Sequence, residues 1–276
     1  MENPFDEWDW HDPDALDAKF ESFTANIATF DTLDTVAPTP PGDRAALRAA
    51  GITGIEFAAF KTQHPEGLAT DLVSVRARKH GSAGTEPGGT PLEAAADSEA
   101  PFVTHRGPMY RVDGESLFTE LDIAEPLPFD DDSLDWVYAE HLIEHVPLPI
   151  AVRWLKEVRR VLAPGGLLRL TTPDLAVYVE GYGGGGFFAK HRRRLAMVRV
   201  GSPMPARRAF MINQIFYHFG HRWIYDADEL RFVLGEAGFD AEQITLCGFR
   251  TGTRPDVADL DTSMRSDESI YIEAVA

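Results

Sequence analysis

The side chains best suited to chemistry lie in one short segment, Glu140-His141-Leu142-Ile143-Glu144-His145. If the segment is helical, His141, Glu144 and His145 share one face at spacings i, i+3 and i+4. That face could present a histidine as a general base, or hold a divalent metal. A third interpretation is an ordinary turn after a strand, with His145 hydrogen-bonded to backbone and Glu140 or His141 near a ligand. The run His-x-x-Glu-His also matches a zinc-hydrolase pattern, which we discount because five residues match easily by chance.

The elements that must position this cluster alternate between strand and helix patterns. Apolar residues recur at three-to-four spacing in 150–162, which predicts a helix that the turn Ala163-Pro164-Gly165-Gly166 ends. A second helix is predicted at 226–237, with Asp226 as its cap. Strands are predicted at 54–60, 68–75, 117–123, 134–140, 167–172, 244–249 and 269–274. This alternation predicts an α/β fold with a doubly wound sheet.

The domain organisation follows from composition. Residues 1–45 combine acidic residues with aromatics and end in a Pro-rich linker, so we expect an extension that packs on the main domain or forms a homodimer contact. Residues 46–276 are expected to form one domain, in which the breaker-rich stretch 81–101 is a mobile loop.

Charge and hydropathy exclude several classes of partner. A formal net charge of −18 repels phosphate backbones, so we expect no nucleic-acid partner. No apolar run approaches the roughly 20 residues that span a bilayer, and the first residues are acidic where a signal peptide is basic, so we expect a cytoplasmic protein without a membrane partner. The single cysteine, Cys247, excludes an internal disulfide and a Cys-rich zinc site.

The middle of the chain resembles class I S-adenosylmethionine-dependent methyltransferases of the broad type 11 group. The resemblance rests on the phrase LPFD at 127–130, the strand that begins at Asp135, the helix with Glu157 and Arg160, and LAPGG at 162–166. It continues more loosely through GHRWIYD at 220–226 and covers most of 50–276. The resemblance implies a Rossmann-like, seven-stranded sheet of the class I methyltransferase fold, with S-adenosylmethionine as the cofactor.

The same resemblance implies which residues hold the cofactor. Asp71, at the end of the second predicted strand, stands where the ribose hydroxyls are bound, and Asp122 with Ile123 stands where the adenine lies. Glu140 and the cluster after it stand beside the transferable methyl group, which makes His141 or His145 the candidate catalytic base. We expect no metal; if one binds, His141, Glu144 and His145 are its candidate ligands, because a related register binds metal in ubiquinone-pathway O-methyltransferases.

The glycine-rich loop after the first strand departs from the family pattern. Glu56 keeps the acidic position, but Ala58 and Phe60 stand where glycines let the backbone approach the cofactor. The sequence therefore supports two functions. The first is methyl transfer from S-adenosylmethionine to oxygen of a small molecule or glycan. The alternative is a non-catalytic partner or binding protein of the same fold that has lost the cofactor.

Overall fold

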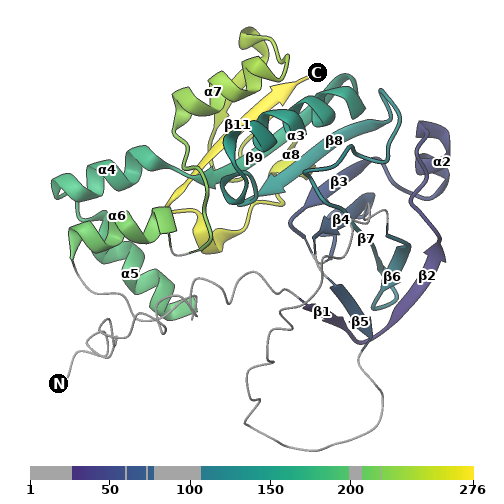
Figure 1. Cartoon of the computed structure of the whole chain (residues 1–276), viewed down its shortest axis with the longest axis horizontal. Coiled ribbons are helices and arrows are strands. Elements are labelled where there is room, and N and C mark those ends of the chain that lie inside the picture. Colours follow the sequence, from purple (N-terminus) through teal and green to yellow (C-terminus); the bar gives the residue numbers. More distant parts are fainter. Residues whose placement is uncertain (1–26, 60, 73, 78–106, 199–206, 218) are drawn as a thin grey trace, which may run out of the picture.

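The computed structural model describes residues 27–59, 61–72, 74–77, 107–198, 207–217 and 219–276. A mixed sheet of nine strands forms its centre, in the order β10-β11-β9-β8-β3-β4-β7-β6-β2 (Figure 1). The strands of the central part are β3 (Gly54–Phe57), β4 (Gly67–Asp71), β7 (Ser116–Glu120), β8 (Leu134–Glu140) and β9 (Leu162–Pro173). All five run parallel.

Antiparallel strands extend the sheet on both sides. At one edge β11 (Ser269–Val275) pairs antiparallel with β9, and β10 (Ile244–Cys247) pairs antiparallel with β11. At the other edge β6 (Met109–Val112) and β2 (Leu33–Ala37) continue from β7. The Rossmann-like fold with strands at both sides of β3 is therefore confirmed, but the sheet has nine strands rather than the predicted seven.

The two additional strands change the expected boundaries. Because β2 belongs to the sheet, the sheet begins at Leu33, ahead of the boundary expected near residue 46. The strand predicted at 68–75 is two strands, β4 and β5 (Ser74–Ala77), and β5 pairs with β1 (Ile27–Phe30) in a separate two-stranded sheet.

Alternation along β8 shows how the sheet is buried on both faces. Val137 and Ala139 belong to the main apolar core, whereas Trp136 and Tyr138 pack in a smaller cluster on the opposite face. The main core is covered by α2 (Arg44–Ala49), α3 (Leu148–Val161) and α7 (Ala227–Glu236). The opposite face is packed by α8 (Pro255–Ala258) and the residues after it. Burial on both faces explains why β8 and β9 read as apolar runs.

The two helices predicted from sequence are present. The side chain of Asp226 accepts hydrogen bonds from the backbone of Asp228 and Glu229, which confirms the predicted cap of α7. The LAPGG turn does end α3, but it lies inside β9, where the pairing with β8 jumps from Leu162 to Leu167. Gly165 takes φ +79° in this bulge, a conformation that favours glycine.

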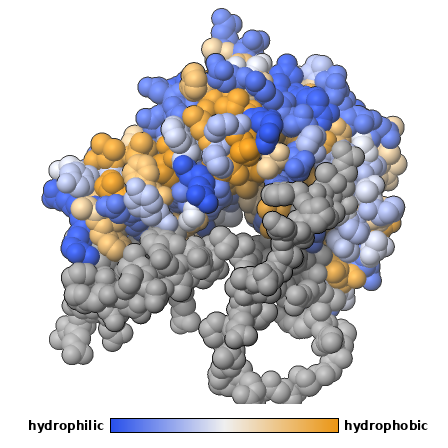
Figure 2. All heavy atoms as spheres, viewed as in Figure 1, coloured by the Kyte–Doolittle hydropathy of each residue, from blue (hydrophilic) through white to orange (hydrophobic). Residues whose placement is uncertain are grey.

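Between β9 and α7 in the sequence, the described part of the chain forms three helices that we call the cap. It consists of α4 (Leu175–Gly183), α5 (Phe187–Val198) and α6 (Arg208–Tyr217), which have their own small apolar core around Tyr178 and Met211. Short 3-10 turns complete the chain: η1 (Ile143–His145), η2 (Ala241–Gln243) and η3 (Ser263–Arg265). Large hydrophobic side chains are exposed on the cap, and the cap end of Figure 2 accordingly shows hydrophobic residues among hydrophilic ones.

Several sequence predictions fall outside the described residues. Phe60, the loop at 81–101 and residues 1–26, which include most of the expected extension and its homodimer contact, are among them. Within the described part of the chain, none of the helices is both long and apolar enough to cross a bilayer.

Candidate functional site

The strand order places the predicted site residues at the carboxyl ends of the parallel strands. From β3 the chain passes to β4 and β7 on one side and to β8 and β9 on the other, so the order reverses between β3 and β8. Ligands of open α/β sheets bind at such a reversal, beyond the carboxyl ends of the strands. Ala58, Asp71 and Glu140 lie at the carboxyl ends of β3, β4 and β8, and Asp122 lies two residues beyond the end of β7.

Glu56 organises the loop that follows β3. Its buried carboxylate accepts hydrogen bonds from the backbone of Gln63 at 2.9 Å and of His64 at 2.8 Å, and also from the hydroxyl of Thr62. These donors come from the loop itself and fold the segment after β3 back onto the strand. The predicted acidic position is therefore a loop anchor in this structure.

Ala58 confirms that the loop needs an unusual backbone conformation at the predicted glycine position. Its φ is +54°, in the left-handed region where a side chain costs about 1–2 kcal/mol relative to glycine. The loop therefore keeps the backbone conformation of a glycine position, although the residue is alanine.

Asp71 is a half-buried carboxylate for which the described residues supply one hydrogen bond. Its Oδ1 accepts a 2.7 Å hydrogen bond from the backbone N–H of Leu72. Burial raises the pKa of Asp71 to about 6, and the hydrogen bond from Leu72 offsets only part of this effect. A carboxylate in such a place is stabilised by additional hydrogen-bond donors, which the hydroxyl groups of a ribose would supply.

The other predicted cofactor residues have local contacts. Oδ1 of Asp122 accepts a 2.8 Å hydrogen bond from the backbone of Ala124, which forms a turn after β7. Ile123 is buried in the main core. Oε1 of Glu140 accepts a 2.8 Å hydrogen bond from the hydroxyl of Thr262 and a 3.2 Å bond from its backbone N–H.

The histidine and carboxylate cluster is not on an α-helix. Residues 143–145 form the turn η1, and His141 precedes it at φ +51°. Glu144 is nevertheless close to His141. Its Oε1 forms an ion pair with Nδ1 of His141 at 3.2 Å, which does not meet the criteria for a hydrogen bond. Oε2 of Glu144 accepts a 2.9 Å hydrogen bond from the hydroxyl of Thr172.

Both ring nitrogens of His141 have neighbours that limit what the side chain can do. Its Nε2 lies 2.7 Å from Oγ of Ser269, whose hydroxyl donates its proton to the carbonyl of Arg265 at 2.8 Å. Nε2 must therefore donate to Ser269, while Nδ1 faces the carboxylate of Glu144. Both ring nitrogens of His141 therefore face side-chain partners, Ser269 on one side and Glu144 on the other.

Charge around Glu144 keeps its carboxyl group ionised. Complete burial acts to raise its pKa, but the contact with His141 and the neighbouring His145 and His221 hold the pKa well below its usual range. His145 is partly exposed, and burial lowers its pKa. Burial also lowers the pKa of His221 to about 4, so this imidazole is neutral at pH 7.

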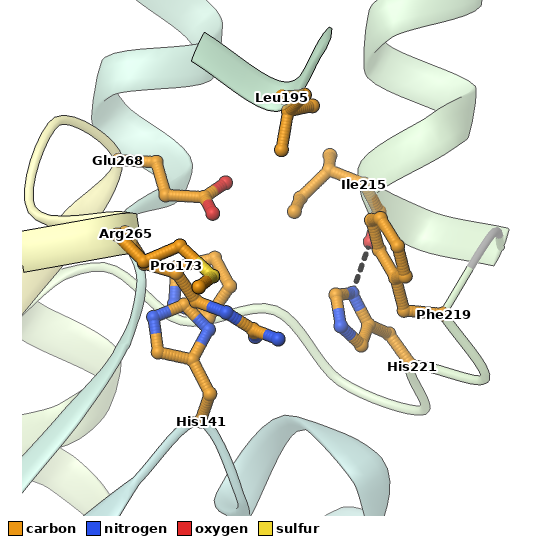
Figure 3. Close-up of a pocket in the computed structure, with 9 residues that line it drawn as sticks. His141, Pro173, Leu195, Ile215, Phe219, His221, Arg265 and Glu268 are labelled. Carbon is orange, nitrogen blue, oxygen red and sulfur yellow. Dashed lines mark hydrogen bonds between the residues drawn. The ribbon is translucent and has the colours of Figure 1, made fainter. Parts of the chain in front are cut away.

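A small cavity, which we call the inner cavity, lies between the end of β8 and the cap and has room for about one water molecule (Figure 3). Its wall contains charged and imidazole groups set among apolar side chains. The lining residues are His141, Pro173, Leu195, Ile215, Phe219, His221, Met264, Arg265 and Glu268.

Buried polar groups support the wall of the inner cavity. The hydroxyl of Tyr178 donates to Oε2 of Glu268, which also lies 3.3 Å from Nε2 of His191. Nδ1 of His191 lies 3.2 Å from Asp267. Burial, reinforced by the charge of Glu268, raises the pKa of Tyr178 well above its ordinary value. The network fixes Glu268 at the cavity wall.

A second, more open cavity of about 700 Å³, which we call the outer cavity, lies among the start of α4, the end of α6 and the start of α7. His221 lines both cavities. The outer cavity joins aromatic rings to carboxylates, and its lining residues are Leu175, Phe216, Tyr217, His221, Arg222, Trp223, Ile224, Asp226, Asp228 and Glu229.

The sequence analysis missed three of these residues as parts of one site. His221, Arg265 and Glu268 are 80 or more residues away from His141 and come from different segments. The run 216–225 was dense in aromatics and histidines, which was the one available signal for His221. No pattern in the sequence indicated Arg265 or Glu268.

Comparisons with known proteins find similarity to methyltransferases. Residues 100–170 match the family model described as a methyltransferase domain. A probable methyltransferase, ltbC, of Aspergillus luteorubrus is 36% identical over 77 residues, which are 28% of this chain and 25% of that protein. The match thus spans about a quarter of the relative's length.

Solved structures show weaker likeness. A possible histamine N-methyltransferase of Thermotoga maritima is 19% identical with a TM-score of 0.35, covering 59% of this chain and 65% of that one. An S-adenosylmethionine-dependent methyltransferase of Archaeoglobus fulgidus is 12% identical with a TM-score of 0.39, covering 84% and 92%. At these scores, residues of one chain cannot be placed on the other.

Proposed function

We propose that this chain, whose residues 100–170 match the methyltransferase domain model, transfers a methyl group from S-adenosylmethionine to an oxygen of a small molecule or glycan. The observation that carries the proposal is the reversal of strand order between β3 and β8, with Asp71 and Glu140 at the carboxyl ends of the strands on its two sides.

Residues at the edge of the sheet fit the cofactor. Asp71 is ionisable and half-buried and accepts one hydrogen bond from the described residues, so the two ribose hydroxyls would stabilise its charged form. Asp122 uses one carboxylate oxygen for its turn, which leaves the other for the exocyclic amine of adenine, and Ile123 follows it toward the ring. When bound, S-adenosylmethionine would supply the methyl group on its positively charged sulfur: the acceptor oxygen would bond to the methyl carbon, the carbon–sulfur bond would break, S-adenosylhomocysteine would leave, and the hydroxyl proton would pass to solvent.

Positioning of the acceptor is the chief task of the remaining residues. Methyl transfer requires the oxygen, the methyl carbon and the sulfur to be aligned in a closed site. Glu140 is held by Thr262 at the end of β8, and the next residue, His141, forms part of the inner cavity wall. The inner cavity has room for about one acceptor oxygen beside His141, so the rest of the acceptor would lie outside it. Because His141 is engaged at both nitrogens, we assign it to orienting Glu144 and not to removing the acceptor's proton.

The outer cavity supports a hydroxylated acceptor. Trp223 and Tyr217 expose their rings there, 41% and 65% respectively, beside Asp226 and Glu229. Aromatic faces pack against the apolar face of a sugar or phenol ring, while carboxylates accept hydrogen bonds from hydroxyl groups. This combination favours a glycan or polyhydroxylated small molecule over a charged polymer.

Transfer of labelled methyl from S-adenosylmethionine to a panel of phenols, hydroxy acids and oligosaccharides tests the proposal. We expect label in at least one hydroxylated acceptor, and a loss of cofactor binding in Asp122→Ala. Asp43→Ala is the matched control, because Asp43 also caps a backbone N–H but lies on α2. If the purified chain neither binds the cofactor nor transfers label, the non-catalytic binding protein suggested by Ala58 replaces the enzyme.

A further inference from the structure

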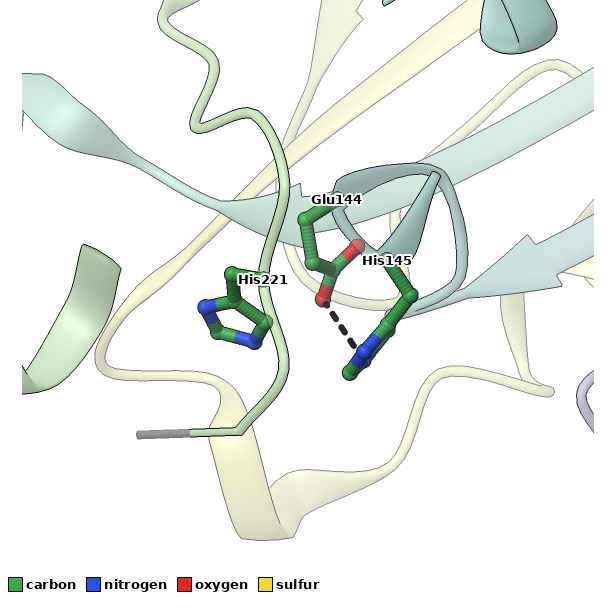
Figure 4. A group of neighbouring side chains, drawn as sticks. All are labelled: Glu144, His145 and His221. Carbon is green, nitrogen blue, oxygen red and sulfur yellow. Dashed lines mark ion pairs between the residues drawn. The ribbon is translucent and has the colours of Figure 1, made fainter. Parts of the chain in front are cut away.

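A carboxylate and two imidazoles converge where η1 meets the segment that follows α6. Glu144 and His145 lie on η1, while His221 comes from the loop between α6 and α7, 76 residues beyond His145 (Figure 4). One ligand atom from each of the three side chains lies within 4.8 Å of the other two. Oε1 of Glu144 is 4.0 Å from Nε2 of His145, and the rings of His145 and His221 lie 4.8 Å apart at 74°.

Two of the converging atoms are buried and have no hydrogen bond within the described residues. They are Oε1 of Glu144, which forms an ion pair with Nδ1 of His141 at 3.2 Å, and Nε2 of His221; their residues are 0% and 8% exposed. A buried polar atom without a partner costs about 1–3 kcal/mol, so Nε2 of His221 calls for an explanation.

A neighbouring bond fixes the protonation of His221. Nδ1 of His221 lies 2.5 Å from the carbonyl of Ile215, to which it must donate, so its Nε2 carries a lone pair in the neutral ring. A backbone hydrogen bond to one nitrogen, as His221 makes, is the usual means of orienting a histidine that binds a metal through its other nitrogen.

The backbone also joins the two segments that carry the ligands. The N–H groups of Arg222 and Trp223 lie 2.6 Å and 3.2 Å from the carbonyl of Glu144, to which both donate. His221 is therefore held next to Glu144 by main-chain bonds that do not depend on its own side chain. The hydroxyl of Thr172 and the ring of His141 orient the carboxylate of Glu144 from behind.

We propose that Glu144, His145 and His221 bind a divalent transition-metal ion. Two nitrogens and one carboxylate oxygen suit Zn²⁺, Co²⁺ or Fe²⁺, whereas Mg²⁺ and Ca²⁺ prefer oxygen ligands. Metal–ligand bonds of about 2.1 Å require the three atoms to move about 1 Å closer together. The side chain of His145, which is 36% exposed, has room to make this movement.

This set corrects the candidate ligands of the sequence analysis. His141 is not among the three, because its nitrogens are engaged by Ser269 and by the ion pair with Glu144. Its place is taken by His221, which lines both cavities. Three protein ligands leave at least one position for water or for an oxygen of the acceptor. That last consequence rests on the proposed function, whereas metal binding itself does not.

Titration of the full, tag-free chain with Co²⁺ after treatment with a chelator tests the proposal. We expect one Co²⁺ per chain, visible absorption bands of a nitrogen- and oxygen-bound ion, and displacement by Zn²⁺ but not by Mg²⁺. Loss of a ligand in His221→Ala or Glu144→Gln should weaken Co²⁺ binding by about 100-fold or more. His64→Ala is the matched control, because His64 is also a buried histidine but pairs with Asp256.

If circular dichroism shows that a variant at Glu144 or His221 has not folded, His145→Ala replaces it in the test. The side chain of His145 is partly exposed, so its removal disturbs the fold less. Absence of stoichiometric Co²⁺ binding, or equal binding by the wild type and the folded ligand variants, would overturn the proposal. Titration of the same samples with S-adenosylmethionine separates the two hypotheses, because cofactor binding does not require the metal.

Discussion

Replacement of Asp71 by asparagine should make the protein more stable and should weaken its binding of S-adenosylmethionine. The carboxyl group has an ordinary pKa of 3.8, and burial raises the pKa of Asp71 to about 6. Each pKa unit corresponds to about 1.4 kcal/mol, so the ionised side chain costs the folded state up to about 3 kcal/mol at pH 7. Partial exposure of Asp71 reduces this, and we expect Asp71→Asn to gain about 1–2 kcal/mol.

The gain should depend on pH in one direction. A carboxyl group whose pKa is raised on folding stabilises the protein below pH 3.8, and that stability is lost as pH rises through about 6. The advantage of Asp71→Asn should therefore be complete at pH 7.5, about half at pH 5 and absent near pH 3.8. Asparagine keeps an oxygen for the N–H of Leu72, so the local turn is preserved.

Thermal unfolding and cofactor titration measure the two effects on the same sample. A gain of 1 kcal/mol raises the melting temperature of a chain of this size by about 2–4 °C. Loss of charged hydrogen bonds to the ribose, worth about 1.5–3 kcal/mol, predicts about 10- to 100-fold weaker S-adenosylmethionine binding. Asp43→Asn, at an exposed cap, should change neither quantity. An Asp71→Asn protein that is no more stable at pH 7.5, or that binds the cofactor normally, would refute the reasoning.

Two further substitutions test the structure. Ala58→Gly should stabilise the protein by up to about 1 kcal/mol, because φ at this position is +54°; urea unfolding measures the change, and a loss of stability would show that the loop conformation is wrong. Arg169→Ala should destabilise it by about 3–5 kcal/mol in the same assay, because it leaves the buried carboxylates of Asp261 and Glu273 without their partner. Arg169→Lys should not restore this stability, since Arg169 uses two nitrogens on Asp261, at 2.8 Å and 2.6 Å.

Sequence patterns predicted the buried, regular part of the fold well. The bounds of β8 agree at both ends, because its buried aromatic and branched residues are flanked by acidic loop residues. The helices α3 and α7 were found from their periodic apolar faces, and Asp226 acts as the cap expected of it. These elements are fixed by local propensity and burial together, and both signals are visible in sequence.

Elements with weak burial escaped prediction. The strand β2 buries neither face fully and carries Asp34 and Thr35, so its pattern resembles a loop. The cap helices α4 and α6 have no narrow apolar stripe, because they pack against one another on several sides. Their presence depends on contacts between segments, which the sequence does not display.

Spacing alone could not define the chemical cluster. The sequence left a helix and a turn after the strand both open for the segment around Glu144, and the structure has the turn η1, with His141 before it at a positive φ. The partner that completes the cluster, His221, approaches through main-chain bonds to the carbonyl of Glu144. Such long-range backbone contacts leave no periodic trace in the sequence.

Calorimetric titration of the purified chain with S-adenosylmethionine and S-adenosylhomocysteine tests the central claim most directly. The account predicts binding of one molecule of either compound per chain at micromolar concentration, weaker below pH 6 as Asp71 becomes protonated. Absence of heat with both compounds, in a sample that unfolds cooperatively, would contradict a cofactor site at the carboxyl ends of β3, β4 and β8.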